Sequence, residues 1–349
     1  MRVREVAHWH IAVLKQKQFQ LSLLVTQIAF DPETLVPRRI LIGANAHAEL
    51  GRALSAILGD RASQVEIRGN RHTELSVADL DWADAYVGFR RPPAGTMGNV
   101  RWVHCTGAGV DSWLYPDELP RDILLTRTAE SFGPMIAEWA LARALAFTQR
   151  LASLAESQKR REWASCDPAF VRGSRALVVG TGDVGAHIAR AFSSMGCHVA
   201  GVSRSGQGDP SVFDTVHEVS SLGALVGDAN WLILALPLTS ATRGLVSPEI
   251  LSACRGAVLI NAGRGAVVDE ASIPVALENG CLSGAALDVF EVEPLPQSSP
   301  LWDHPQVMIS PHNSGPTTID GAVSGFIECL RELERGELPK RIVDRERQY

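Results

Sequence analysis

Residues 175–196 read RALVVGTGDVGAHIARAFSSMG and carry the clearest fold signal in the chain. The apolar start of this stretch predicts a buried strand, and the apolar spacing that follows predicts a helix. Gly180, Gly182 and Gly185 lie between them in G-x-G-x-x-G spacing. The first glycine allows a tight turn, the second lets the backbone approach a pyrophosphate, and the third lets helix and strand pack closely. The spacing alone is a weak signal, but its position between a strand and a helix predicts a dinucleotide-binding unit.

Short apolar segments recur after this stretch, separated by helix-like segments long enough for the crossovers of a parallel sheet. The strands expected in this series are 175–180, 198–203, 231–236, 257–261 and 284–288. The regular alternation predicts a doubly wound α/β fold.

An earlier series of strands begins with RRILIGAN (38–45), which is followed by a helical pattern. The further strands expected there are 85–89, 101–105 and 123–126. Helical spacing runs from 133 to 163, long enough to cross from one domain to another, and again from about 317 to 335. The 349 residues are sufficient for two domains.

The composition is that of a globular protein, with 46% hydrophobic and 21% charged residues. A formal net charge of −6 supplies no basic excess for binding phosphates, so no nucleic-acid partner is expected. No apolar run reaches the roughly 18 residues of a membrane-spanning helix, so no membrane partner is expected either. The six cysteines lie far apart, which predicts neither a metal site nor disulfides and suits a cytoplasmic protein.

The second strand of the nucleotide-binding series ends in HVAGVSRSG (198–206). An acidic residue that binds the ribose 2′-hydroxyl of NAD is expected about 20 residues past the glycines. Ser203, Arg204 and Ser205 stand there instead. A carboxylate would repel a 2′-phosphate, whereas a guanidinium and hydroxyls can bind one. NADP(H) is therefore favoured, and NAD(H) is the alternative if Arg204 only stacks on the adenine.

Three charged side chains follow later strands, at the edge where an open α/β sheet binds its ligands. Arg264 lies in NAGRGAVVDE (261–270), Glu293 in DVFEVEPLP (288–296) and His312 in SPHNSG (310–315). Singly, each could be an ordinary surface or structural residue. Together, a histidine can exchange a proton with an alcohol, a carboxylate can fix its tautomer, and an arginine can bind a carboxylate and polarise the adjacent carbonyl. Leu236-Pro237 ends another strand and is expected to line the nicotinamide ribose.

The chain resembles the D-isomer-specific 2-hydroxyacid dehydrogenase family through the succession VVGTGDVG, ALPLTSATRGLV, LINAGRGAVVDE, GAALDVFEVEPLP and SPHNSG. The resemblance covers about residues 38–335. It implies a hydride transfer between nicotinamide C4 and C2 of a 2-keto or 2-hydroxy acid. By this resemblance His312 is the catalytic acid/base, Glu293 orients it, and Arg264 binds the substrate carboxylate and keto oxygen.

The resemblance also implies the remaining contacts. Backbone N–H groups around Ala108, Gly109 and Val110, in CTGAGVDSW (105–113), are expected to hold the substrate carboxylate. Asp288 is expected near the nicotinamide carboxamide, and the glycines beside Arg264 are interpreted as making room for substrate and cofactor. The residues expected to contact the cofactor are Gly180, Thr181, Gly182, Asp183, Val184, Gly185, Ser203, Arg204, Ser205, Leu236, Pro237, Thr242, Ala262, Gly263, Asp288, His312 and Gly315.

By the same resemblance the chain has two Rossmann-like domains with the active site in the cleft between them. The substrate domain would comprise 38–145 and 309–349, and the dinucleotide-binding domain 146–308. Residues 1–37 have no counterpart in the family pattern and are interpreted as an N-terminal extension rather than a signal peptide. Family members are commonly dimers that associate through the cofactor domain, so a homodimer is expected.

The leading hypothesis is an NADP(H)-preferring, D-specific reductase of a small 2-keto acid, of the glyoxylate/hydroxypyruvate reductase type. By resemblance, reductases of these acids often carry an Arg-Ser pair where Arg204 and Ser205 stand. Two alternatives remain open: an NAD-dependent enzyme similar to phosphoglycerate dehydrogenase, and a nicotinamide-sensing corepressor that binds the cofactor without turnover. Formate dehydrogenase relatives are disfavoured because they lack the glutamate that Glu293 supplies.

Overall fold

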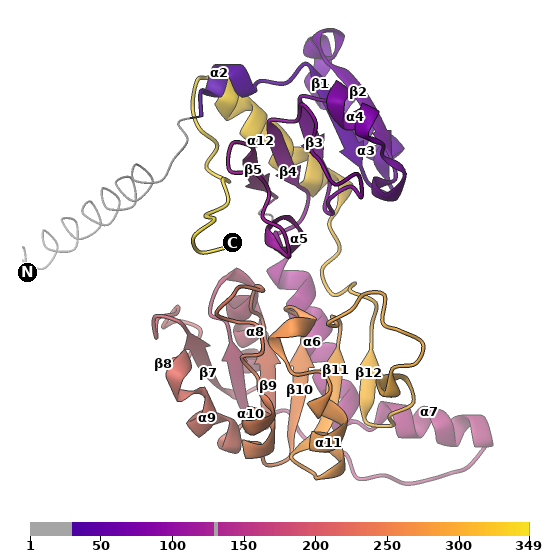
Figure 1. The fold of residues 1–349 in the computed structure, drawn as a ribbon. Coiled ribbons are helices and arrows are strands. Elements are labelled where there is room, and N and C mark those ends of the chain that lie inside the picture. Colours follow the sequence, from indigo (N-terminus) through magenta and orange to yellow (C-terminus); the bar gives the residue numbers. More distant parts are fainter. Residues whose placement is uncertain (1–29, 129–131, 349) are drawn as a thin grey trace, which may run out of the picture. The chain divides into compact units, whose positions relative to one another are not determined.

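The structure, a computed structural model, describes residues 30–128 and 132–348 and divides into two units, each with its own parallel sheet (Figure 1). Within the described residues, unit 1 comprises 30–128 and 319–343, and unit 2 comprises 132–318 and 344–348. The long helix after residue 132 therefore belongs to unit 2, whereas the sequence-based boundary at 145/146 assigned most of it to the substrate domain.

Unit 1 contains a five-stranded sheet in the order β2-β1-β3-β4-β5, in which every pair is parallel. The strands are β1 (Arg39–Gly43), β2 (Glu66–Asn70), β3 (Ala85–Val87), β4 (Trp102–Cys105) and β5 (Leu124–Arg127). The helices are α2 (Pro32–Leu35), α3 (His47–Leu58), α4 (Val77–Trp82), α5 (Asp111–Leu114) and α12 (Ile319–Glu334), with 3-10 turns η1 (Gly59–Gln64) and η2 (His72–Glu74).

The core of unit 1 includes part of the segment that the sequence analysis assigned to an N-terminal extension. Leu35 of α2 is buried in one cluster with Ile40 of β1 and Phe326 of α12, and Phe30 and Val36 pack against this cluster. Residues 30–37 are thus part of the folded unit. Residues 1–29 lie outside the described residues.

Unit 2 contains a seven-stranded parallel sheet in the order β12-β11-β10-β9-β6-β7-β8. The strands are β6 (Arg175–Val179), β7 (His198–Ser203), β8 (Thr215–Glu218), β9 (Trp231–Leu234), β10 (Ala257–Asn261), β11 (Leu282–Leu287) and β12 (Val307–Ile309). The helices are α6 (Gly133–Thr148), α7 (Leu151–Arg160), α8 (Asp183–Ser194), α9 (Leu222–Leu225), α10 (Pro248–Ala253) and α11 (Ser272–Glu278). The 3-10 turns are η3 (Val219–Ser221), η4 (Val226–Asp228), η5 (Gly265–Val267) and η6 (Pro300–Trp302).

Alternate residues of the central strand β6 bury themselves against helices on opposite faces of this sheet, as the two-residue period of a strand requires. Leu177 and Val179 belong to the cluster formed with α9, α10 and α11. Val178 instead faces α8, where it approaches Gly185. The strand order reverses between β6 and β9, which creates the switch point where open α/β sheets bind ligands. The doubly wound α/β prediction is confirmed.

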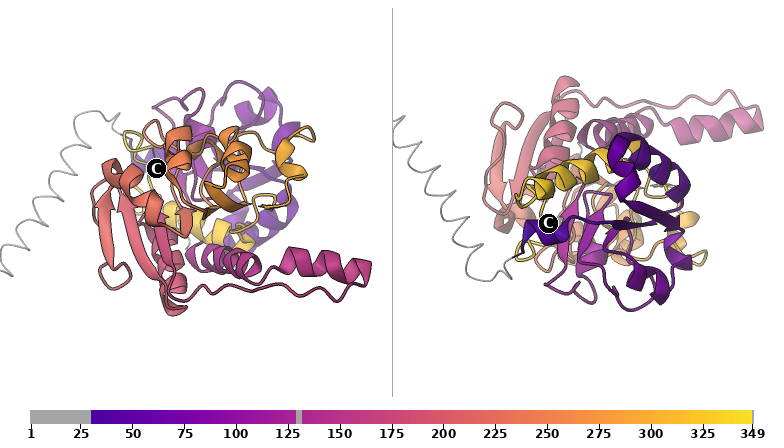
Figure 2. Two further views of the ribbon diagram at one scale, coloured as in Figure 1. Left: turned by 90° about the horizontal axis from the view of Figure 1, so that it is seen from below. Right: turned by 90° about the horizontal axis from the view of Figure 1, so that it is seen from above.

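The prediction of one continuous helix over 133–163 is wrong, because the helix is interrupted between α6 and α7. Arg150 adopts a left-handed conformation with φ of 53°, which ends the regular helical geometry. Helix α7 and the segment after it form an arm that extends away from the rest of unit 2 (Figure 2).

Candidate active site

In the turn from β6 to α8, each of the three glycines is explained by a different physical requirement. Gly180 has φ of 107°, and a Cβ there would lie 2.5 Å from the carbonyl oxygen of Ala235. A Cβ at Gly185 would overlap the carbonyl oxygen of Gly180, so helix and strand can approach only without a side chain. A Cβ at Gly182 would meet nothing within 4 Å. The open space above Gly182, at the start of α8, fits a pyrophosphate that binds backbone N–H groups.

The loop after β7 is closed by hydroxyl groups. The Ser203 hydroxyl donates to the carbonyl of Gln207 at 2.9 Å and accepts the Gln207 N–H at 3.0 Å, and Thr181 in the glycine turn donates to the same carbonyl at 2.7 Å. Ser203 and Thr181 therefore shape this loop through hydrogen bonds within the protein. Arg204 and Ser205 are exposed at its tip, where a guanidinium and a hydroxyl can reach a 2′-phosphate.

Hydrogen bonds also fix the loop after β9. The Thr242 hydroxyl donates to the carbonyl of Pro237 at 2.7 Å and accepts the N–H of Thr239 at 2.8 Å. This closes the segment that begins with Leu236-Pro237. The neighbouring residue of the next strand end, Ala262, donates its N–H to the carbonyl of Leu234 at 3.2 Å. The backbone segments that follow β9 and β10 are thus hydrogen-bonded to each other.

The glycines beside Arg264 lie against backbone from neighbouring segments. A Cβ at Gly263 would lie 2.7 Å from the carbonyl oxygen of Leu236, and one at Gly265 would overlap the backbone of Phe290. Neighbouring backbone therefore requires glycine at both positions, and their interpretation as space for substrate and cofactor stays a prediction. Arg264 is half-buried, and its Nη1 donates to the carbonyl of Gly263 at 2.8 Å.

The side chains of His312 and Glu293, which the sequence analysis expected to act as an acid/base pair, lie in contact. Nδ1 of His312 lies 2.8 Å from Oε2 of Glu293, and Oε1 of Glu293 accepts the N–H of Phe290 at 3.2 Å. Nε2 of His312 has no hydrogen-bond partner within residues 30–128 and 132–348. The carboxylate thus fixes the ring through one nitrogen and leaves the other for a ligand.

Arg264 contributes to the electrostatics of this pair. Burial alone would raise the pKa of Glu293, but the hydrogen bond and charge of His312, the Phe290 N–H and the positive charge of Arg264 together hold it below its usual value. The residues follow β10, β11 and β12, which are neighbours in the sheet. Unit 2 therefore brings Arg264, Glu293 and His312 together at one edge of its sheet.

Asp288 anchors the loop that carries His312. Its carboxylate is fully buried and accepts hydrogen bonds from the Ser310 hydroxyl at 2.6 Å, the Asn313 N–H at 3.0 Å and the Ser314 N–H at 2.9 Å. His312 has φ of 52°, which is unusual for a residue with a side chain, and its N–H donates to the Asp288 carbonyl at 2.8 Å. The contact of Asp288 with a nicotinamide carboxamide stays a prediction.

Comparison with known proteins identifies the family. Residues 141–314 match the family model described as "D-isomer specific 2-hydroxyacid dehydrogenase, NAD binding domain". A glyoxylate/hydroxypyruvate reductase A of Serratia proteamaculans is 31% identical over 300 residues, which cover 82% of this chain and 93% of that protein. The chain belongs to the D-isomer-specific 2-hydroxyacid dehydrogenase family. The predicted class, an NAD(P)-dependent dehydrogenase acting on a CH–OH group, is thereby confirmed.

Solved structures of this dehydrogenase family share the fold. A family member from Xanthobacter autotrophicus, in complex with NADPH and MES, is 31% identical with a TM-score of 0.77 and covers 90% of this chain and 100% of its own. An NADPH-dependent glyoxylate/hydroxypyruvate reductase from Sinorhizobium meliloti, in complex with NADP and sulfate, is 27% identical with a TM-score of 0.76 and covers 89% and 99%.

Two supporting contacts of this dehydrogenase escaped the sequence analysis. Oε2 of Glu270 accepts the N–H of Glu291 at 2.9 Å and so fixes the segment that carries Glu293. Burial raises the pKa of Glu270, and the carboxylates of Glu291 and Glu293 add to this effect. Nε1 of Trp139 donates to the Ser310 hydroxyl at 3.1 Å, which connects α6 to the Asp288 network. The acidic end of AVVDE was the available signal for Glu270, whereas nothing in the sequence near Trp139 pointed to Ser310.

The expected substrate residues of the dehydrogenase lie in unit 1, in the loop after β4. Val110 is buried, and Ala108 and Gly109 are partly exposed. The remaining expected cofactor residue, Gly315, lies in unit 2, where a Cβ would lie 2.9 Å from the Ile136 side chain, so packing requires a glycine there.

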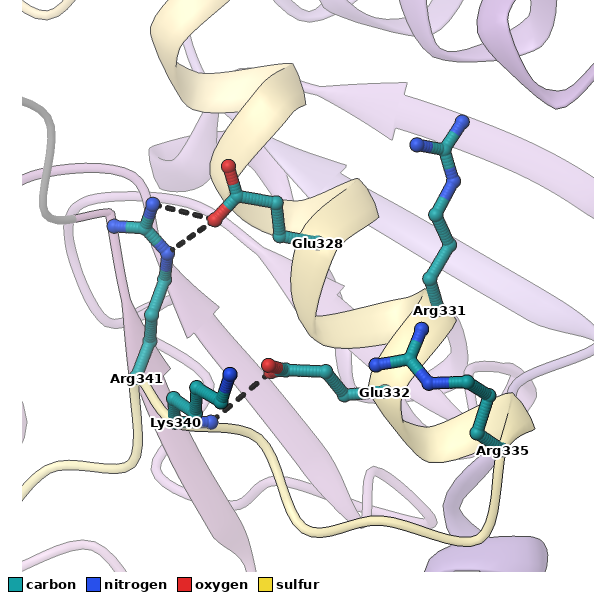
Figure 3. Close-up of a pocket in the computed structure, with 6 residues that line it drawn as sticks. All are labelled: Glu328, Arg331, Glu332, Arg335, Lys340 and Arg341. Atoms are coloured by element: carbon teal, nitrogen blue, oxygen red, sulfur yellow. Dashed lines mark hydrogen bonds and ion pairs between the residues drawn. The ribbon is translucent and has the colours of Figure 1, made fainter.

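A pocket of about 390 Å³ lies elsewhere in unit 1, at the carboxyl end of α12 (Figure 3). Arg341 binds Glu328 through Nε at 2.8 Å and Nη2 at 2.5 Å, and the N–H of Lys340 donates to Glu332 at 3.0 Å. The pocket's carboxylates are thus matched by its own cations and backbone, and we assign it no ligand. In the described part of the chain, no group of three or more His, Cys, Asp or Glu side chains could hold a metal ion, and no helix is long and apolar enough to span a membrane.

Proposed function

We propose that this dehydrogenase reduces a small 2-keto acid of the glyoxylate or hydroxypyruvate class to the 2-hydroxy acid, with NADPH as the reductant and with D specificity where the product is chiral. The 2.8 Å contact between His312 and Glu293 carries the proposal, because it joins a proton donor to the carboxylate that orients it. The names of the Serratia and Sinorhizobium relatives support the substrate class.

Arg264, Glu293 and His312 are proposed to have separate roles in the reaction. When bound, NADPH supplies the hydride that is added to C2 of the keto acid. His312, held by Glu293 through Nδ1, delivers a proton from Nε2 to the keto oxygen. Arg264 binds the substrate carboxylate and the keto oxygen, and so stabilises the negative charge that develops on that oxygen. In unit 1, the N–H groups around Ala108, Gly109 and Val110 are proposed to bind a substrate carboxylate.

The cofactor choice rests on two observations in unit 2. The open space above Gly182 leaves room for a pyrophosphate, which either nicotinamide cofactor contains. The exposed Arg204 and Ser205 follow β7, where an enzyme selective for NAD would carry a carboxylate. NADP(H) in the two related structures supports the same preference. Residues Thr181, Asp183, Val184, Leu236, Pro237, Thr242, Ala262, Gly263 and Gly315 are proposed to complete the cofactor site.

The arm of unit 2 favours a homodimer. Four apolar side chains on α7 and the segment after it are exposed: Leu151, Leu154, Trp163 and Phe170. These elements form the arm that extends from unit 2 in Figure 2. A second copy of the chain would cover these apolar side chains. Light scattering on the purified protein tests this assembly, and Trp163→Glu should shift it toward monomer. The six free cysteines support a reducing location such as the cytoplasm.

Absorbance at 340 nm tests the reaction. Purified protein is mixed with glyoxylate, hydroxypyruvate, pyruvate or phenylpyruvate and with either NADPH or NADH. Oxidation of NADPH by glyoxylate or hydroxypyruvate is the expected result, and chiral analysis of the glycerate formed from hydroxypyruvate tests D specificity. Absence of turnover with all four acids, while the cofactor still binds, would refute the proposal and favour a binding role.

A further inference from the structure

In the loop after β4, two successive backbone carbonyls accept hydrogen bonds from side chains of unit 1. Nη1 of Arg127 donates to the carbonyl of Ala108 at 2.9 Å, and the Cys105 thiol donates to the carbonyl of Gly109 at 3.3 Å. In a planar trans peptide, the N–H points away from the C=O of the same peptide unit. The Gly109 N–H therefore points away from Arg127, and the Val110 N–H points away from the Cys105 thiol.

These N–H groups are available to a ligand. In the described part of the chain, no acceptor is hydrogen-bonded to the N–H groups of Ala108, Gly109 or Val110. An amide donor that finds neither a protein acceptor nor water is costly. A carboxylate has two oxygens that can accept adjacent N–H groups, and such bonds to a charged acceptor are strong.

The rest of the loop is held rigidly in unit 1. A Cβ at Gly107 would lie 2.6 Å from the ring of Phe89, so this backbone lies directly against the ring. The Ser112 hydroxyl and Trp113 Nε1 both donate to the carbonyl of Phe89, at 3.1 and 3.0 Å. The loop is thus fixed at both ends, and the Arg127 contact sets the direction of the peptide in its middle.

Arg127 is itself well placed to do this. It is the last residue of β5 and pairs in register with Cys105, the last residue of β4. Its own N–H donates to the carbonyl of Arg341 at 3.1 Å. A guanidinium held beside the Ala108 carbonyl also withdraws electron density from that peptide, which makes the Gly109 N–H a stronger donor.

We propose that Arg127 is a positioning residue for the substrate: it orients and polarises the peptide between Ala108 and Gly109 so that the N–H binds the keto-acid carboxylate. This inference rests on the proposed function, which supplies the carboxylate. It adds a second arginine to the recognition of the substrate, one that acts through the backbone, whereas Arg264 acts directly.

The test compares Arg127→Met with Arg127→Lys, which retains a charged donor. Arg341→Met is the matched control, because it removes a neighbouring arginine whose side chain binds Glu328 instead of the loop. Two quantities are measured: the KM for glyoxylate against the KM for NADPH, and the Kd of oxamate, a non-reducible analogue of a 2-keto acid, in the presence of NADPH.

Arg127→Met is expected to raise the KM for glyoxylate and the Kd of oxamate on the order of 10-fold, the usual effect of losing a hydrogen bond to a charged group. The KM for NADPH should change less than about twofold, Arg127→Lys should recover most of the loss, and Arg341→Met should bind oxamate like the wild type. Equal effects of Arg127→Met and Arg341→Met, or equal rises in both KM values, would overturn the proposal in favour of a general structural role.

The remaining outcomes separate this inference from the proposed function. A wild type that reduces glyoxylate, together with a folded Arg127→Met variant of unchanged oxamate affinity, would refute the role of Arg127 alone. A wild type that neither reduces any keto acid nor binds oxamate would refute the proposed function. If Arg127→Met does not fold, Arg127→Gln replaces it, since it keeps a donor and removes the charge. Unchanged oxamate affinity in Arg127→Gln would overturn the polarising role.

Discussion

Replacing Glu293 with glutamine changes the candidate active site with almost no change in size. The carboxylate uses both oxygens as acceptors, one for the Phe290 N–H at 3.2 Å and one for His312 Nδ1 at 2.8 Å. Glutamine has a single acceptor oxygen, so it can satisfy only one of these donors. If its amide nitrogen faces His312, Nδ1 must act as an acceptor and the doubly protonated ring loses its partner. If the amide nitrogen instead faces Phe290, it lies against the Phe290 N–H, and two hydrogen-bond donors repel each other.

The expected magnitude follows from the lost interaction. A hydrogen bond to a charged group contributes about 1.5–3 kcal/mol, and each 1.36 kcal/mol corresponds to about a factor of 10 in rate. The side chains of His312 and Glu293 are 34% and 21% exposed, so solvent weakens the pair. We therefore expect the lower part of the range, a fall in kcat/KM for glyoxylate of roughly 10- to 30-fold.

The same variant should change the pH dependence of keto-acid reduction. Because the pKa of Glu293 lies below its usual value, the wild-type carboxylate is ionised at neutral pH and loses its charge only as pH falls into the acid range. Its contribution to catalysis is therefore full at neutral pH and is lost at acid pH. The difference in kcat/KM between the wild type and Glu293→Gln should accordingly be largest at neutral pH and shrink as pH falls.

The assay follows NADPH oxidation at 340 nm from about pH 4, near the ordinary pKa of a glutamate, to about pH 8. Glu291→Gln is the control, since it removes the same charge from an exposed side chain two positions earlier. Glu293→Gln kinetics that match this control in both rate and pH profile would refute the assignment of Glu293 as the partner of His312.

Four further substitutions test the remaining roles. His312→Ala should lower kcat by roughly 10²–10⁴-fold while NADPH affinity, followed by fluorescence, stays unchanged; near-normal turnover would remove the acid/base role. Arg204→Asp should reverse the ratio of kcat/KM values for NADPH and NADH, and a retained NADPH preference would contradict the 2′-phosphate contact. Gly182→Ala adds a methyl group in open space, so it should keep the wild-type Tm and lose NADPH affinity; unchanged affinity would argue against a pyrophosphate there. Gly185→Ala would overlap the Gly180 carbonyl and should cost about 1–3 kcal/mol of stability, measured by denaturant unfolding, where a wild-type midpoint would contradict the packing argument.

The sequence predicted the central strands of both sheets and missed three of the four outermost strands, β2, β8 and β12. The fourth outermost strand, β5, was expected because residues 123–126 read ILLT, and all of these side chains are buried in the structure. β2 reads EIRGN, with three of its five residues exposed, and β12 has only three residues. An edge strand that is short or half exposed lacks the continuous apolar run that identified β1, β6 and β10.

The sequence also identified the side chains of the candidate site better than it explained them. Positions after predicted strands pointed to Arg264 and Glu293, and the family motif SPHNSG pointed to His312. The reason for Gly265 depends on the backbone of Phe290, which comes from a distant strand end. No local pattern encodes such a contact. The left-handed conformation of His312 was equally invisible, because it is imposed by the buried hydrogen bonds of Asp288.

The order of Arg264, Glu293 and His312 along the chain is also their order across β10, β11 and β12. Each crossover between these strands returns through the opposite edge of the sheet, where the turn after α11 at Gly280 has φ of 72° and open space around it. New chain termini, or a whole inserted domain, could therefore be introduced at Gly280 without altering the spacing of the three side chains. The chemistry of this protein is in that sense separable from its connectivity: a circular permutant opened at Gly280 should keep the proton-transfer machinery intact.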